Sequence, residues 1–288
     1  MRTAIRLSTS MEALAALAAH VRVGAETLDV APEVHVLLRA IAAELVGEPA
    51  DGDANQAAVV GMTRTLLRQA IDLVDNPGRA GGWSYTDHAL LQGIGQMSAS
   101  IVEAFKAAGA QLPGLLDYLR GSGRTFLDVG TGTAWLAIAT AREYPSLSVE
   151  GMDIFENALS LARANVASEG MQRRIRLRMQ DITTLHEPDA FDVIWLPLPF
   201  LPKEIVAGAI TAAVRSLRPG GWLLPGAFGG GVDRLAELLI DLRTLRSGGH
   251  PWSADEIVSM LGAAGLTDPC EVPRTWSAPV RLYAARRT

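Results

Sequence analysis

A glycine loop beside a carboxylate is the part of the sequence with the clearest chemical capacity. The apolar run at residues 126–129 contains Asp128 and leads directly into Gly130, Thr131 and Gly132, and a helical pattern follows. Glycines at this spacing let the backbone turn sharply and let a ligand approach it closely. Ligands of open α/β sheets bind beyond the carboxyl ends of the strands, so the loop predicts a cofactor site.

A dinucleotide site is the first alternative for this loop. The G-x-G-x-x-G fingerprint requires a third small residue three positions after the second glycine, and this chain has Trp135 there. An indole opposes the close helix–strand packing on which that fingerprint depends. A nicotinamide oxidoreductase therefore stays only as the last alternative.

The loop resembles the first motif of class I S-adenosylmethionine (SAM)-dependent methyltransferases, in which an acidic residue precedes a Gly-x-Gly turn. Asp128, Gly130 and Gly132 match that motif, and Ala134 is the small residue often found next. The resemblance implies that the loop, with Thr131 inside it, wraps the methionine part of SAM. SAM carries an ammonium and a sulfonium but no phosphate, so a carboxylate suits this cofactor.

Two later strand ends carry acidic residues in the order that this family shows. Asp153 ends the second expected strand, where a carboxylate can accept hydrogen bonds from both ribose hydroxyls, and Ile154 and Phe155 would flank the adenine. The resemblance implies that Asp181 meets the adenine amine and that the backbone of Ile182 contacts the ring. The plainer alternative is that each aspartate only caps the helix that follows it.

The residues at the end of the fourth expected strand differ from the motif that one branch of this family has there. Members that methylate exocyclic or amide nitrogens often have Asp/Asn-Pro-Pro-Phe/Tyr there, whereas this chain has the apolar run at residues 196–200. Methylation of DNA, RNA bases and amides is therefore disfavoured. Trp195 and Phe200 could face the sulfonium by cation–π contact, or they could equally belong to the core.

A polar segment at residues 83–98 is the candidate for a lid with catalytic groups. Tyr85, His88 and Gln92 recur at helical spacing, so they could share one helix face. We expect His88 to be the general base, if one is needed, with Tyr85 beside it. The alternative is the polar outer face of a packing helix. The remaining histidines are expected to be structural or remote from the methyl group: His20, His35, His186 and His250.

The pattern of elements predicts an α/β chain with a Rossmann-like sheet behind an all-helical N-terminal domain. Apolar residues at helical spacing predict helices over residues 10–23, 31–47, 55–74 and 86–110, the last capped by Thr86 or Asp87. Strands and helices alternate after about residue 123, which predicts a mostly parallel sheet. The last two strands predict an antiparallel hairpin at its edge. We place the domains at residues 1–112 and 113–288.

The amino-acid composition limits the classes of partner and the cellular compartment that we expect. A net charge of −5 opposes a nucleic-acid surface, and the single Cys270 excludes a disulfide framework, which fits a cytoplasmic protein. We recognise no signal peptide, no membrane span and no metal-ligand spacing. The sequence predicts a SAM-dependent methyltransferase that acts on oxygen, nitrogen or carbon of a small organic molecule, with a homodimer possible. The alternatives are a protein or peptide methyltransferase, and a SAM-binding protein without transfer activity.

Overall fold

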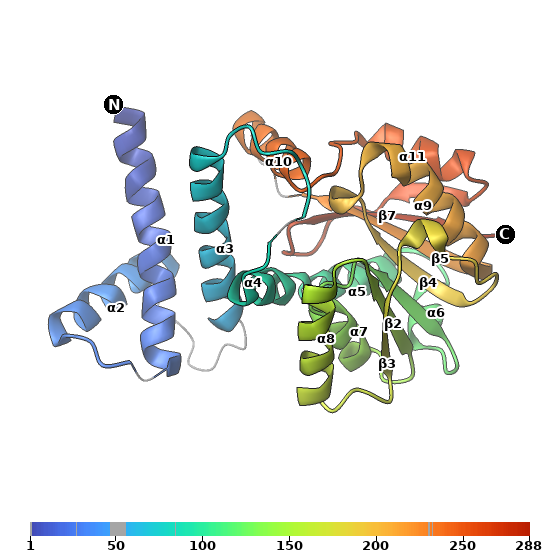
Figure 1. Ribbon diagram of the computed structural model, residues 1–288, viewed down its shortest axis with the longest axis horizontal. Helices are drawn as coiled ribbons and strands as arrows, with labels where there is room; N and C mark the ends of the chain where they lie inside the picture. The colour runs from blue at the N-terminus through green and yellow to red at the C-terminus, as the bar shows by residue number, and fades with distance from the viewer. Residues whose placement is uncertain (1, 27, 47–55, 84, 230, 232) are drawn as a thin grey trace. The chain divides into compact units, whose positions relative to one another are not determined.

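The computed structural model (Figure 1) describes residues 2–26, 28–46, 56–83, 85–229, 231 and 233–288. Positions 47 and 55, where two of the predicted helices end and begin, lie outside these residues. The chain divides into two compact units, residues 1–77 with 92–97 and residues 78–91 with 98–288.

The first unit is helical in its described part. It contains α1 (Arg2–Glu26), α2 (Pro32–Val46), α3 (Gln56–Asp75) and the middle of α4 (His88–Ser98). Helices α3 and α4 cross at Gly61 and Gly93, where a Cβ on Gly61 would lie 3.0 Å from the Cα of Gly93. Only glycine permits so close an approach of two helix backbones.

The second unit is built on a seven-stranded sheet with the order β3-β2-β1-β4-β5-β7-β6. The strands are β1 (Thr125–Val129), β2 (Ser148–Asp153), β3 (Ile175–Met179), β4 (Phe191–Pro197), β5 (Leu217–Phe228), β6 (Thr267–Glu271) and β7 (Val280–Arg286). Strands β1 to β5 pair in parallel, whereas β7 runs antiparallel to both β5 and β6. The predicted mostly parallel sheet with an antiparallel last strand is confirmed, and so is the terminal hairpin.

Helices cover both faces of this sheet and bury its two cores. One core receives α5 (Ile101–Gln111), α6 (Leu115–Arg120), α7 (Trp135–Glu143) and α8 (Glu156–Ser168). The other core receives α9 (Lys203–Ser216) and α11 (Ala254–Ala263), and α10 (Arg234–Arg246) is largely exposed. Successive residues of a strand point to opposite faces, so Phe126 enters the first core and Leu127 the second.

The segment expected as one helix over residues 86–110 forms two helices. Helix α4 ends at Ser98 and α5 begins at Ile101, with Ser100 between them. Serine competes with the helix backbone for hydrogen bonds and so favours helix ends. Helix α5 places Phe105 in the core of the sheet unit, although the sequence assigned it to the helical N-terminal segment. In the described part of the chain, the structure has no helix with the length and apolar character that crossing a membrane requires.

Candidate cofactor and acceptor site

The glycine loop joins β1 to α7 through three residues with left-handed backbones. Gly130 has φ of 65°, Gly132 has φ of 55° and Ala134, the residue before α7, has φ of 66°. The loop is held against β2 because the amide of Thr131 donates to the carbonyl of Met152 at 3.0 Å. A Cβ on Gly130 would lie 3.3 Å from Cγ of Pro197 at the end of β4. The two glycines therefore meet a conformational demand that most residues would strain.

The side chain of Asp128 holds this loop through a hydrogen bond. Its side chain is 1% exposed, and its Oδ2 accepts a hydrogen bond of 2.7 Å from the hydroxyl of Thr131. Burial, together with the negative charge of nearby Asp153, raises the pKa of Asp128 to about 7. The predicted acidic residue of the first motif is thus enclosed in the fold and fixes the loop that it precedes.

Asp153, at the end of β2, ties the second strand to the same loop. Its Oδ2 accepts from the amide of Gly132 at 2.8 Å, and its Oδ1 accepts from the amide of Phe155 at 2.9 Å. Burial also raises the pKa of Asp153. A carboxylate oxygen has capacity for two acceptor contacts, so a ligand hydroxyl can still bind there. An ionised carboxylate at this loop favours a cationic ligand and opposes a bare phosphate.

The residues predicted to meet the adenine differ in their exposure. Ile154 is 65% exposed beside Asp153, whereas Ile182 is 4% exposed. Asp181 caps a short helix at residues 182–184, where its Oδ1 accepts from the amide and hydroxyl of Thr183 at 2.8 and 2.7 Å. Asp181 therefore caps this short helix, and its contact with adenine stays a prediction.

Trp195 on β4 lies in the core of the sheet unit. It is 4% exposed, its ring centroid lies 5.4 Å from that of Phe105, and its indole fills the space where a Cβ on Gly226 would stand. Packing accounts for this side chain, as the core alternative expected, and a role next to the sulfonium stays a prediction.

Aromatic side chains form a row beyond the carboxyl ends of β4 and β5. The ring centroids of Trp83 and Phe200 are 5.3 Å apart, and those of Phe200 and Phe228 are 5.7 Å apart, both edge to face. Tyr85 meets Trp83 in the same way at 5.2 Å. Phe200 thus belongs to an aromatic surface at the edge of the sheet where ligands of this fold class bind.

The segment at residues 78–91 is anchored to the sheet unit by its backbone. The amide of Gly82 donates to the carbonyl of Arg246 at 3.2 Å, and a Cβ on Gly81 would lie 2.3 Å from the carbonyl oxygen of Leu245. Asp87 caps α4 by accepting from the amide of Leu90 at 2.7 Å, as one of the two predicted caps.

The two predicted catalytic residues, Tyr85 and His88, lie in different surroundings within this segment. Tyr85 precedes α4, which begins at His88, so the helical spacing that would align the two side chains does not apply. Tyr85 lies in the aromatic row, and His88 is exposed at the helix start.

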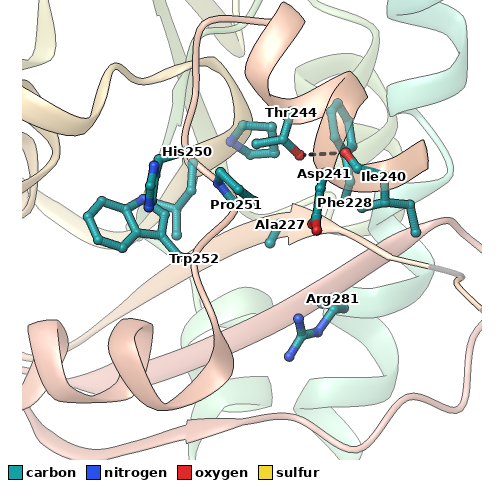
Figure 2. A pocket seen from close by; sticks show the side chains of 11 residues that line it. Ala227, Phe228, Ile240, Asp241, Thr244, His250, Pro251, Trp252 and Arg281 are labelled. Atoms are coloured by element: carbon teal, nitrogen blue, oxygen red, sulfur yellow. Dashed lines mark hydrogen bonds between the residues drawn. The ribbon is translucent and has the colours of Figure 1, made fainter. Parts of the chain in front are cut away.

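A small pocket opens beside the aromatic row and was not found from the sequence. Figure 2 shows side chains from β5, α10, the turn before α11 and β7 gathered around it. Its polar lining is Asp241, Thr244, His250 and Arg281, and Phe228 joins it to the row. No local pattern connects residues so far apart in the chain; only the order β4-β5-β7 brings them together. Among the described residues, no group of His, Cys, Asp and Glu could hold a metal ion.

Comparison with known proteins identifies the domain that contains the loop. Residues 126–221 match the family model of a methyltransferase domain. The release factor glutamine methyltransferase of Rhodopirellula baltica is 35% identical over 128 residues, which make up 44% of this chain and 42% of that protein. The chain spans about half the length of the curated relatives it matches.

Solved structures resemble nearly the whole chain. An O-methyltransferase family protein from Burkholderia thailandensis aligns with a TM-score of 0.70 and 16% identity over 99% of this chain and 97% of its own. Human N-acetylserotonin methyltransferase, solved in complex with SAM, aligns with a TM-score of 0.67 and 17% identity over 99% and 97%. The chain therefore contains a methyltransferase domain and has the fold of the class I SAM-dependent methyltransferases.

Proposed function

We propose that this chain is an enzyme that transfers a methyl group from SAM to oxygen, nitrogen or carbon of a small organic acceptor. One observation carries the proposal: the glycine loop of a methyltransferase domain is braced by two carboxylates, Asp128 and Asp153. In this assignment Gly130, Thr131 and Gly132 hold the methionine part of SAM. Asp153 holds the ribose, and the adenine lies near Ile154, Asp181 and Ile182.

The chain's own task in such a reaction is alignment. Bound SAM supplies an electrophilic methyl group, and transfer is an in-line displacement by a nucleophile of the acceptor. The protein must hold the acceptor in line and keep water away. The aromatic row, Trp83–Phe200–Phe228, lies where an apolar acceptor can be shielded in this way.

A small acceptor is favoured by the side chains that follow β4. Leu198, Pro199 and Phe200 offer no side-chain hydrogen bond to an amide or a base edge. The aromatic row beside them is instead suited to an apolar molecule.

A peptide acceptor is the second candidate because the relative from Rhodopirellula baltica is a release factor glutamine methyltransferase. A direct test incubates the purified chain with methyl-labelled SAM and two acceptor sets, small hydroxyl- or amine-bearing molecules and glutamine-containing peptides. We expect label in the small molecules only. Transfer to peptide glutamine would contradict the acceptor class, and SAM binding without any transfer would favour a non-transferring protein.

His88 is proposed as the general base where the acceptor must lose a proton, with Tyr85 beside the acceptor. Exposure of His88 at the start of α4 leaves it accessible to a substrate. The measurement is turnover of His88→Ala with saturating acceptor; unchanged turnover would remove His88 as the base.

The assembly and the domain boundary belong to the proposal as well. Helix α2 exposes Val36 at 66% and Leu37 at 62%, an apolar face that a second copy could cover. We retain the homodimer, the cytoplasmic setting and a boundary near residue 112 as expectations. Limited proteolysis around residues 78–113 would test the boundary.

A further inference from the structure

We propose that the pocket beside the aromatic row binds an amino group of the acceptor through the carboxylate of Asp241. This inference rests on the proposed function and narrows its substrate class to apolar molecules that carry an amine. The amine is the anchoring group of the molecule, and the methylated atom is a separate matter.

The position of the pocket assigns it to the acceptor. It is lined by Leu198 and Pro199 directly after β4, and by Ala227 and Phe228 at the end of β5. The glycine loop follows β1, which neighbours β4 on its other side. Cofactor loop and pocket therefore open at the same edge of the sheet, and Phe228 links the pocket to Phe200.

The charges around the pocket favour a cation. Asp241 lines the pocket from α10 and Arg281 lines it from β7 (Figure 2). Arg281 is already neutralised, because its Nε and Nη2 donate to the two carboxylate oxygens of Glu271 at 2.7 and 2.9 Å. Among the described residues, the side chain of Asp241 has no hydrogen-bond or ion-pair partner. The half-buried carboxylate of Asp241 is thus available to pair with a cationic group of a ligand.

Two further charged groups near the pocket, Lys203 and Glu256, have opposite signs. Lys203 lies over the ring of Trp252 with its Nζ 5.5 Å from the centroid, and Glu256 is within electrostatic reach of Lys203 and His250. With Arg281 paired to Glu271, Asp241 is the unpaired carboxylate among the described residues that line the pocket.

The apolar side chains that line the pocket favour a ligand whose main part is apolar. Phe228, Ile240 and Pro251 surround the polar groups, and the ring of Trp252 packs on His250 with centroids 4.5 Å apart. The enclosed part of the pocket is small, about 40 Å³. It admits one head group, while the rest of the molecule extends along the aromatic row.

Three probes with one body and different heads test the inference: phenethylamine, 3-phenylpropionate and 2-phenylethanol. Their binding to the full chain saturated with S-adenosylhomocysteine is measured by ligand-observed NMR. We expect phenethylamine to bind at least tenfold more tightly than the acid, with the alcohol between them. Equal affinities, or a preference for the acid, would overturn the inference on the wild-type chain alone.

Two matched variants test whether Asp241 is the source of the preference for an amine. Asp241→Asn keeps the shape of the side chain and should reduce amine affinity about tenfold without changing S-adenosylhomocysteine affinity. Asp255→Asn, in the exposed first turn of α11, is the control and should change neither. An unchanged amine preference in Asp241→Asn would overturn the assignment. Failure of wild type to bind S-adenosylhomocysteine would instead contradict the proposed function, and the amine preference can then be measured on the ligand-free chain.

Discussion

Asp128 should make the stability of the fold depend on pH in an unusual direction. Its pKa is raised from an ordinary value near 4 to about 7 because the side chain is buried. Between these values the unfolded state loses its proton while the folded state keeps it, so this group lowers the free energy of unfolding as pH rises. The loss is complete above pH 7 and amounts to about 4 kcal/mol.

The matching variant is Asp128→Asn, which cannot ionise. We expect its melting temperature, relative to wild type, to be higher at pH 8 than at pH 5. Asp255→Asn, an exposed carboxylate, should show no such difference. A wild-type chain and Asp128→Asn that respond identically to pH would show that Asp128 is not held in its neutral form.

Alanine substitutions at Gly132 and Gly170 distinguish the effect of backbone strain from the effect of lost ligand contact. Both have left-handed backbones, with φ of 55° and 66°, and a Cβ at either position would meet open space or an ordinary contact at 4.0 Å. Alanine should therefore destabilise the fold by about 1 kcal/mol at each position. Only Gly132→Ala should also weaken S-adenosylhomocysteine binding, because Gly132 lies in the cofactor loop. Equal binding by both alanine variants in titration calorimetry would argue against that role.

Asp192 joins three elements at the amino-terminal edge of the sheet. It is fully buried at the start of β4 and accepts from Arg124 at 2.6 Å, from the amide of Thr125 at 2.8 Å and from Arg218. Removing this carboxylate leaves two arginines and a backbone amide without their partner.

Asp192→Ala should therefore reduce the free energy of unfolding by about 1–3 kcal/mol, measured by urea denaturation. Glu187→Ala removes the exposed partner of Arg178 and serves as the control, with an expected loss of about 0–1 kcal/mol. Similar losses in the two variants would mean that the buried network contributes no more than a surface ion pair.

Elements with strong local patterns were predictable, and those that depend on distant partners were not. The strand before the glycine loop and the acidic ends of β1 and β2 follow from an apolar run that stops at a turn. The short helix α6 has six residues, too few for a periodic pattern. The pocket escaped detection because Asp241 and Arg281 lie 40 positions apart in the sequence. His250, expected to be a turn residue, does precede α11 in a turn, and folding also places it in that pocket.

Association is the property of the whole molecule that its surface indicates most directly. Val36 and Leu37 on α2 are large apolar side chains that are mostly exposed, and contact with a second copy would bury them. We expect sedimentation velocity to give a mass near twice the 30.6 kDa of one chain, and Leu37→Glu to reduce it to one. A wild-type chain that sediments as a single copy at micromolar concentration would rule out the homodimer.

Cofactor binding by the glycine loop is tested most directly by calorimetric titration of the purified chain with SAM, S-adenosylhomocysteine and NADH. We expect the two sulfur compounds to bind and NADH not to bind. Asp153→Ala should weaken both sulfur compounds at least tenfold, because the ribose hydroxyls lose their acceptor and Gly132 loses the carboxylate that holds its amide. Binding of NADH without binding of either sulfur compound would contradict the methyltransferase assignment and return the loop to the dinucleotide-binding class.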